Sequence, residues 1–102
     1  MFGTIARVRL KPGKKEALRH AMAEEDTAEI SGWIADYLFE SSQEAQVCYL
    51  VAFFKDEASY IANADSSAQH ERYLKFRACL VDDPEWNDGH VISATGPGAY
   101  RT

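Results

Sequence analysis

The stretch VCYLVAFFKDEASYIANADSSAQHERYLKFRACLV, residues 47–81, determines the fold class of this chain. Its first eight residues are apolar at nearly every position, which is typical of a central strand that is covered on both faces. Asp56 is a natural N-cap for a short helix, and Ser66 with Gln69 three residues later forms a capping box for a second one. The stretch therefore predicts a strand followed by a helix that is broken in two.

The N-terminal half supplies the other elements of a two-layer fold. Residues 2–10 alternate with a period of two, as in a strand with one buried face, and a Lys-Pro-Gly turn ends them. Residues 33–41 alternate again and connect to the central strand by a short polar hairpin loop, and residues 90–94 form a short last strand. The intervening helix begins near Lys14 and is expected to end near Thr27. Its helical spacing is carried by Ala17, Leu18, Ala21, Met22 and Glu25.

The order β-α-β-β-α-β predicts an α+β, ferredoxin-like fold with helices on one face of a four-stranded antiparallel sheet. We expect one such domain over residues 1–94, followed by a C-terminal tail over residues 95–102. The other sheet face would be apolar and uncovered, so we expect a homodimer that packs sheet against sheet. The residues expected on that face or in the core are Trp33, Tyr37, Tyr49 and Phe53.

Composition limits the classes of partner and compartment. The net charge of -5, from 11 basic and 16 acidic residues, argues against nucleic-acid binding, which rests on basic patches. No apolar run approaches the roughly 18 residues of a membrane helix, and Arg7 and Arg9 interrupt the N-terminal apolar segment, so we expect a cytoplasmic protein without a membrane partner. Cys48 and Cys79 do not form a CxxC pair and are interpreted as reduced packing thiols.

Two segments, LKPGKKEAL (10–18) and FKDEASYIANADSSAQHERYLKF (54–76), resemble the antibiotic biosynthesis monooxygenase family of dimeric α/β-barrel proteins. With the order of elements, the resemblance covers nearly all of residues 3–94. The family includes cofactor-free oxygenases that convert aromatic polyketide anthrones to quinones, quinol oxygenases and haem-degrading enzymes. The resemblance implies a cofactor-independent monooxygenase whose aromatic, polyketide-like or quinol substrate lies between the sheet and the helices.

The resemblance also implies a set of site residues. Tyr60, Asn63 and Arg77 stand where the anthrone-oxidising members carry a tyrosine and an asparagine on the short helix and an arginine on the long one. Phe54 stands where those members carry a tryptophan. In cofactor-free oxygenation the deprotonated substrate itself reduces oxygen, so the protein must supply donors where negative charge develops, and a dry pocket.

His70 and Tyr73 share one face of the long helix and add a possible base or donor. Each candidate also has an ordinary structural interpretation: a core tyrosine, a helix-ending asparagine, a solvent-facing histidine and a surface ion pair of Arg77. The predicted catalytic residues are Tyr60, Asn63, His70, Tyr73 and Arg77, with Phe54, Cys48 and Trp86 lining the pocket and no metal site.

Two sets of acidic residues are interpreted as structural. Asp36 and Glu40 share one strand face without an evident partner, and residues 24–26 are interpreted as a solvated helix end. Two other functions stay open, a non-catalytic ligand-binding or stress-response dimer and haem binding or degradation. The haem-degrading pattern would fall near Ala6, Phe54 and Tyr73 and is not matched, although His70, one turn before Tyr73, leaves an iron ligand possible.

Overall fold

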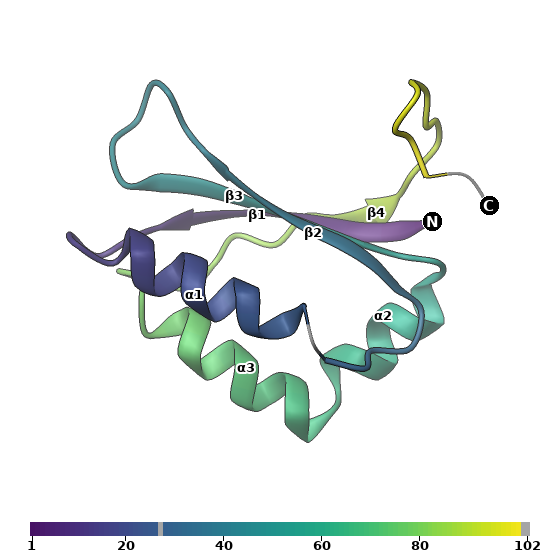
Figure 1. The fold of residues 1–102 in the computed structure, drawn as a ribbon, viewed down its shortest axis with the longest axis horizontal. Coiled ribbons are helices and arrows are strands. Elements are labelled where there is room, and N and C mark those ends of the chain that lie inside the picture. The colour runs from purple at the N-terminus through teal and green to yellow at the C-terminus, as the bar shows by residue number, and fades with distance from the viewer. Residues whose placement is uncertain (27, 101–102) are drawn as a thin grey trace.

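The computed structural model describes residues 1–26 and 28–100. Within them, a four-stranded antiparallel sheet carries three helices on one face, which confirms the predicted α+β, ferredoxin-like fold (Figure 1). The strands lie in the order β2-β3-β1-β4, so β1 and β3 are central. The elements are β1 (Phe2–Arg9), α1 (Lys15–Glu25), β2 (Trp33–Glu40), β3 (Val47–Phe54), α2 (Glu57–Ala64), α3 (Ser67–Arg77) and β4 (Asp88–His90).

The break between α2 and α3 follows from local capping, as the sequence predicts. The side chain of Asp56 accepts a hydrogen bond from the backbone N–H of Ser59 at 2.8 Å and starts α2. The Ser66 hydroxyl accepts one from the backbone N–H of Gln69 at 3.1 Å and starts α3. Because each cap satisfies an otherwise orphaned donor, the two helices begin at fixed residues. The predicted end of α1 at Thr27 lies outside the described residues.

The core lies between the sheet and the helices. Alternate residues of β1 face the helices, and the register pairs Ala6 with Leu50 and Val8 with Cys48 on β3. Leu18 of α1 closes this layer and is fully buried. Burying a leucine side chain of this kind stabilises the fold by about 1.5–3 kcal/mol. The other buried members of the cluster are Leu10, Phe76, Cys79 and Leu80.

The last strand is shorter and earlier than residues 90–94, the range that the sequence predicts. In β4, His90 pairs with Phe2 and Asp88 pairs with Thr4, so the antiparallel register runs toward the start of the chain. One further bond joins the Val91 N–H to the Met1 carbonyl at 2.9 Å. Since β1 begins at Phe2, the residues that follow have no strand to pair with, and the predicted strand cannot extend to residue 94.

Trp33 lies on the helix-covered side of the sheet, which is the core side of the two places that the sequence allows it. The pairing of β2 with β3 shifts register between Trp33 and Ala35, and this irregularity turns the indole toward the helices. Gly32 precedes it with φ of 77°. A Cβ at Gly32 would come within 2.5 Å of the Ser59 hydroxyl oxygen, so the approach to β2 requires glycine.

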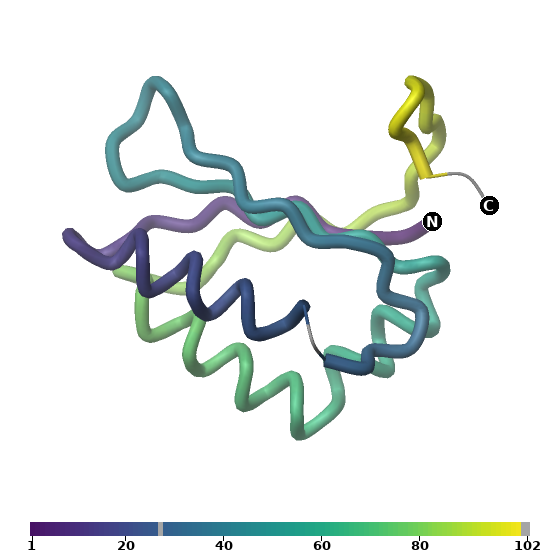
Figure 2. Tube along the Cα trace, in the orientation of Figure 1, coloured from purple at the N-terminus to yellow at the C-terminus, as the bar shows by residue number. Residues whose placement is uncertain are grey.

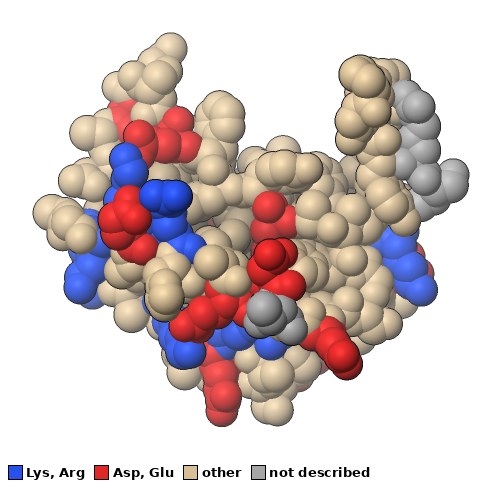
Figure 3. Space-filling model, in the orientation of Figure 1, with Lys and Arg blue, Asp and Glu red and all other residues tan. Residues whose placement is uncertain are grey.

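The opposite face of the sheet is apolar and open. Ile5, Tyr37 and Phe39 are 53%, 62% and 63% exposed on it. Tyr37 packs edge-to-face against Phe53, and Phe39 packs edge-to-face against Tyr49. Figure 2 shows that the β2–β3 connection and the C-terminal segment both rise from the sheet on this side, away from the helices. In Figure 3 the surface is hollowed between these two projections.

No helix in the described part of the chain is long and apolar enough to cross a membrane.

Candidate active site

A cavity of about 430 Å³ lies between the sheet and the helices. Its floor comes from β1, β2 and β3, and its walls come from the end of α1, from α2 and α3, and from the segment that leads into β4. This is the place in the fold where the sequence predicts a pocket. The predicted site residues that line it are Tyr60, Asn63, His70, Tyr73, Phe54 and Trp86.

Tyr60 is held rigidly at one end of the cavity. Its ring packs edge-on against Phe2 and Phe54, with ring centroids 5.1 and 5.6 Å away. Its hydroxyl donates to Asp88 Oδ1 at 2.9 Å. Burial, and then the hydrogen bond to Asp88 and its charge, raise the pKa of Tyr60 to about 12, although the Thr4 hydroxyl acts in the opposite direction. Tyr60 is therefore a neutral donor at physiological pH, and its proton is already directed at Asp88.

An arginine of α3 orients two amides in the cavity wall. Arg72 Nη2 donates to Asn63 Oδ1 at 3.4 Å, and Arg72 Nε donates to Gln69 Oε1 at 3.1 Å. A guanidinium can only donate, so both amide oxygens must face it. Since Asn63 and Gln69 line the cavity, their NH₂ groups are the donors that these two amides can offer to a ligand there. The sequence places Gln69 in a capping box with Ser66, but only half of that box forms. The Ser66 hydroxyl accepts from the Gln69 N–H, whereas the Gln69 side-chain oxygen accepts from Arg72.

Aromatic residues form the wall beside these amides. Tyr73 packs against Trp86 with ring centroids 6.4 Å apart, and it packs against Phe76 at the same distance on the core side. His70 lines the cavity from an exposed position on α3, so it lies at the rim. A flat aromatic ligand would find a stacking surface here, with an imidazole at the opening.

Arg77 lies outside the cavity, contrary to its predicted role. Its Nε donates to Asp83 Oδ1 at 2.8 Å, and its Nη1 donates to the Leu80 carbonyl at 3.1 Å. Arg77 thus takes the surface ion pair that the sequence left as its alternative. The arginine that serves the cavity is Arg72, five residues earlier on the same helix.

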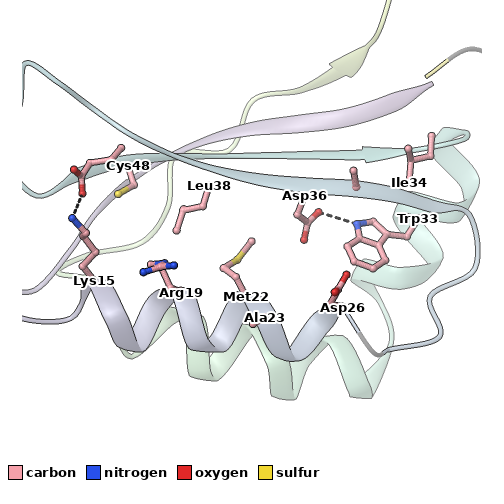
Figure 4. A pocket seen from close by; sticks show the side chains of 12 residues that line it. Lys15, Arg19, Met22, Ala23, Asp26, Trp33, Ile34, Asp36, Leu38 and Cys48 are labelled. Atoms are coloured by element: carbon pink, nitrogen blue, oxygen red, sulfur yellow. Dashed lines mark hydrogen bonds and ion pairs between the residues drawn. The ribbon is translucent and has the colours of Figure 1, made fainter. Parts of the chain in front are cut away.

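Cys48 lies in a second cavity, of about 540 Å³, between α1 and β2 (Figure 4). It is buried, and burial raises the pKa of its thiol, so it is not an activated nucleophile. An ion pair of Lys15 with Glu40, at 2.9 Å, lies at one end of this cavity. Trp33 and Asp36 lie at the other end and also line the first cavity, so they form part of the wall between the two.

Glu25 and Asp36 form a pair of carboxyl groups that the sequence interpretation missed. Glu25, the last residue of α1, is half-buried and lies close to Asp36, and both line the first cavity. Asp36 Oδ1 also accepts a hydrogen bond from Trp33 Nε1 at 2.9 Å. Burial, and then the hydrogen bond to Asp36 and its charge, raise the pKa of Glu25 to about 8, while Arg72 opposes this rise.

The interpretation of residues 24–26 as a solvated helix end is therefore wrong at Glu25. A signal was present in the sequence, because Glu25 continues the apolar stripe of α1, four residues after Ala21 and seven after Leu18. A carboxyl on the buried side of a helix needs a partner, and Asp36 shares its strand face with Leu38, which packs against the core.

The sequence profile described as antibiotic biosynthesis monooxygenase matches residues 1–76. The chain belongs to the antibiotic biosynthesis monooxygenase family. A search of curated proteins gave no match.

Solved structures share the fold of this family member at low sequence identity. SnoaB, a cofactor-independent oxygenase from Streptomyces nogalater, solved as a variant, aligns with a TM-score of 0.77 and 13% identity, covering 94% of this chain and 96% of that one. A conserved protein from Methanosarcina mazei aligns with a TM-score of 0.74 and 20% identity, covering 86% of this chain and 89% of that one. A protein of unknown function from Nitrosomonas europaea aligns with a TM-score of 0.73 and 19% identity, covering 95% of this chain and 94% of that one.

The cavity of this monooxygenase-family protein has an acidic lining. Glu25, Asp36 and Asp88 line it, and no lysine or arginine of the described residues does. Within the same residues, no group of three or more histidine, cysteine or acidic side chains is placed to hold a metal ion. The lining favours a neutral ligand with hydroxyl groups over an anionic one, because like charges repel in a poorly solvated site.

Proposed function

We propose that this protein is a cofactor-independent monooxygenase that acts on a neutral aromatic substrate of the anthrone or quinol class. The substrate lies flat in the cavity between sheet and helices, against Tyr73 and Trp86. The observation that carries the proposal is the pair of amides of Asn63 and Gln69, which line the cavity with their oxygens bonded to Arg72, so that their NH₂ groups are the donors left to a ligand. Such donors are what a reaction through a substrate anion requires.

The proposed reaction begins with loss of a proton from the substrate. The resulting electron-rich anion passes electrons to O₂, and a carbon–oxygen bond forms. For an anthrone, the methylene carbon becomes a carbonyl, one oxygen atom of O₂ enters the product, and the other leaves as water. The two amides stabilise the ring oxygen that carries the negative charge, and the aromatic wall excludes water from the anion.

Oxygen uptake tests the proposal directly. Purified protein, freed of metal and flavin, is mixed with 1,8-dihydroxyanthrone or a hydroquinone, and consumption above the spontaneous rate is measured. With ¹⁸O₂, the anthrone product should carry one labelled oxygen. If saturable binding occurs without catalysed uptake for any substrate tested, the non-catalytic ligand-binding alternative replaces this proposal.

Haem binding has one observation in its favour, which is that His70 lines the cavity. The carboxyl groups of Glu25, Asp36 and Asp88 oppose it, because haem carries two anionic propionates. Titration with haemin distinguishes the two ligand classes. A Soret band that His70→Ala abolishes would support haem, and its absence would remove that alternative.

We further propose that two copies pair through the open sheet face. Three large apolar side chains, Ile5, Tyr37 and Phe39, are more than half exposed there, and a patch of this kind usually marks an interface. Light scattering at about micromolar concentration should give the mass of a dimer. The double variant Tyr37→Asp with Phe39→Asp should give a folded monomer, and a monomeric wild-type protein would contradict the proposal.

A further inference from the structure

Two carboxyl groups from different elements meet in the wall of the candidate active site. Glu25 ends α1, Asp36 lies in the middle of β2, and both line the cavity, close enough to each other for Asp36 to raise the pKa of Glu25. Figure 4 shows the indole of Trp33 donating to Asp36 from the same strand. Asp36 is thus held in place by Trp33, and Glu25 lies beside it in the cavity lining.

An unsatisfied polar group in the same cavity indicates that it accommodates a polar ligand. Thr4 lies on the cavity floor and is 4% exposed. Its hydroxyl lies close enough to the Tyr60 hydroxyl to lower the pKa of that group, but it makes no hydrogen bond of normal geometry among the described residues. Buried hydroxyl groups in folded proteins nearly always have a partner, because an unmade bond in a dry site is costly. The Thr4 hydroxyl, beside Tyr60, can therefore still bond to a ligand in the cavity, independently of the carboxyl pair.

The surroundings of Glu25 make it a stronger base than an ordinary carboxylate. From β2, Asp36 raises its pKa, and from α3, Arg72 lowers it, with burial as the largest effect and a resulting pKa of about 8. The other titratable groups that face the cavity are Tyr60, His70, Tyr73 and Asp88. A base whose pKa lies nearer that of a phenol or an activated C–H group takes its proton more readily.

We propose that Glu25 is the proton acceptor for the substrate in this cavity and that Asp36 is the residue that positions it. The inference rests on the proposed function, and it restricts the substrate to neutral carbon acids and phenols. The C–H or O–H bond of the substrate breaks, its electron pair stays on the aromatic system, and the proton goes to the Glu25 carboxylate. The anion so formed lies between Glu25 and the amide donors of Asn63 and Gln69.

The first test is the pH dependence of oxygen uptake with 1,8-dihydroxyanthrone, from about pH 6 to about pH 10 with the spontaneous rate subtracted. Wild-type kcat/KM should rise to a plateau with a midpoint near the Glu25 pKa of about 8. Glu25→Gln should lose about 100-fold in kcat/KM together with the pH-dependent rise. Retention of the wild-type profile in Glu25→Gln would overturn the proposal and would assign the rise to another group.

Two further variants separate proton transfer from structure. Asp36→Asn removes the neighbouring charge that raises the Glu25 pKa, so the midpoint should move to lower pH, which a purely structural defect would not cause. Glu29→Gln makes the same chemical change as Glu25→Gln at an exposed residue outside the cavity, and it should keep the wild-type rate and profile. An unmoved midpoint in Asp36→Asn would contradict the positioning role.

A binding measurement tests Glu25 even if no turnover is found. 2-Naphthol is titrated into Trp86→Phe protein, and quenching of Trp33, the remaining tryptophan, reports occupancy of the cavity. Affinity should increase about threefold or more as Glu25 ionises, because a carboxylate accepts a hydroxyl proton better than a carboxylic acid does. Glu25→Gln should abolish this increase. Binding that is indifferent to Glu25 would overturn the proposal, whereas pH-dependent binding without oxygen uptake would refute only the proposed oxygenation.

Discussion

The two walls of the cavity differ in what they offer a ligand. The wall from α2 and α3 presents donors, the amide NH₂ groups of Asn63 and Gln69. The wall from α1 and β2 presents acceptors, the carboxyl groups of Glu25 and Asp36. A reaction through a substrate anion needs both, one group to take the proton and another to stabilise the charge that remains. The comparison indicates that each wall has one part of this task.

Removing the donor at Asn63 should lower the rate as strongly as removing the base at Glu25 does. Asn63→Ala should lower kcat/KM by about 100-fold, because it deletes a donor placed where negative charge develops. Asn63→Asp should be at least as impaired, since it replaces that donor with another carboxylate in an acidic cavity. Both are measured by oxygen uptake with 1,8-dihydroxyanthrone. If Asn63→Ala keeps the wild-type rate, the wall from α2 and α3 does not stabilise the substrate anion.

Glu25, in the acceptor wall, should affect the free energy of unfolding as well as the reaction rate. The folded state raises the pKa of Glu25 from 4.5 to about 8, so it binds a proton more tightly than the unfolded chain does. This group therefore favours folding below about pH 4.5, and its contribution is lost as the pH rises to about 8. Glu25→Gln should then be more stable than wild type at about pH 9, by about 1–3 kcal/mol after allowance for solvent screening.

Urea unfolding at several pH values checks this expectation, with Glu29→Gln as the exposed control. The difference between Glu25→Gln and wild type should grow between about pH 5 and about pH 8, while the control shows no such trend. A constant difference across this range would mean that Glu25 titrates normally in the folded protein.

Arg72 connects the two walls, so its removal should affect both. In Arg72→Met the amides lose the group that orients them, and kcat/KM should fall by about tenfold. The midpoint of the pH profile should also move upward, because Arg72 lowers the pKa of Glu25. Arg77→Met, the matched change five residues later on α3, should leave both quantities unchanged, since Arg77 pairs with Asp83 outside the cavity. Equal effects of the two variants would contradict the assignment.

Tyr60 should matter least among the polar residues of the cavity. Its hydroxyl proton already goes to Asp88, so Tyr60→Phe should change kcat/KM by only about threefold. Its ring packing against Phe2 and Phe54 is retained in phenylalanine. A loss of about 100-fold in oxygen uptake would instead make Tyr60 a principal donor, and the donors to the substrate anion would then lie near β4.

The sequence predicts the fold well because its signals are local. The caps at Asp56 and Ser66 and the alternation of β1 depend on neighbours in the chain, and the structure confirms them. The family resemblance also rests on short local motifs. It placed Tyr60 and Asn63 on the short helix, and both residues line the cavity.

The acceptor wall could not be predicted in the same way. The contact of Glu25 with Asp36 depends on how α1 packs over β2, and the orientation of Trp33 depends on an irregularity in strand pairing. The choice between Arg72 and Arg77 depends on the rotation of α3 about its axis, which the spacing of charged residues leaves open. Each of these contacts joins residues on different elements or depends on the register of the sheet. Local sequence patterns therefore cannot predict them.

The most direct test of the two-walled cavity is a crystal structure of the protein with 1,8-dihydroxyanthraquinone, a product-like and unreactive ligand. The account predicts the ring system in the cavity against Tyr73 and Trp86. A carbonyl oxygen should lie within hydrogen-bonding distance of the Asn63 amide, and a hydroxyl or ring edge should face Glu25. A ligand seated between α1 and β2 beside Cys48, or one whose oxygens face neither wall, would contradict it.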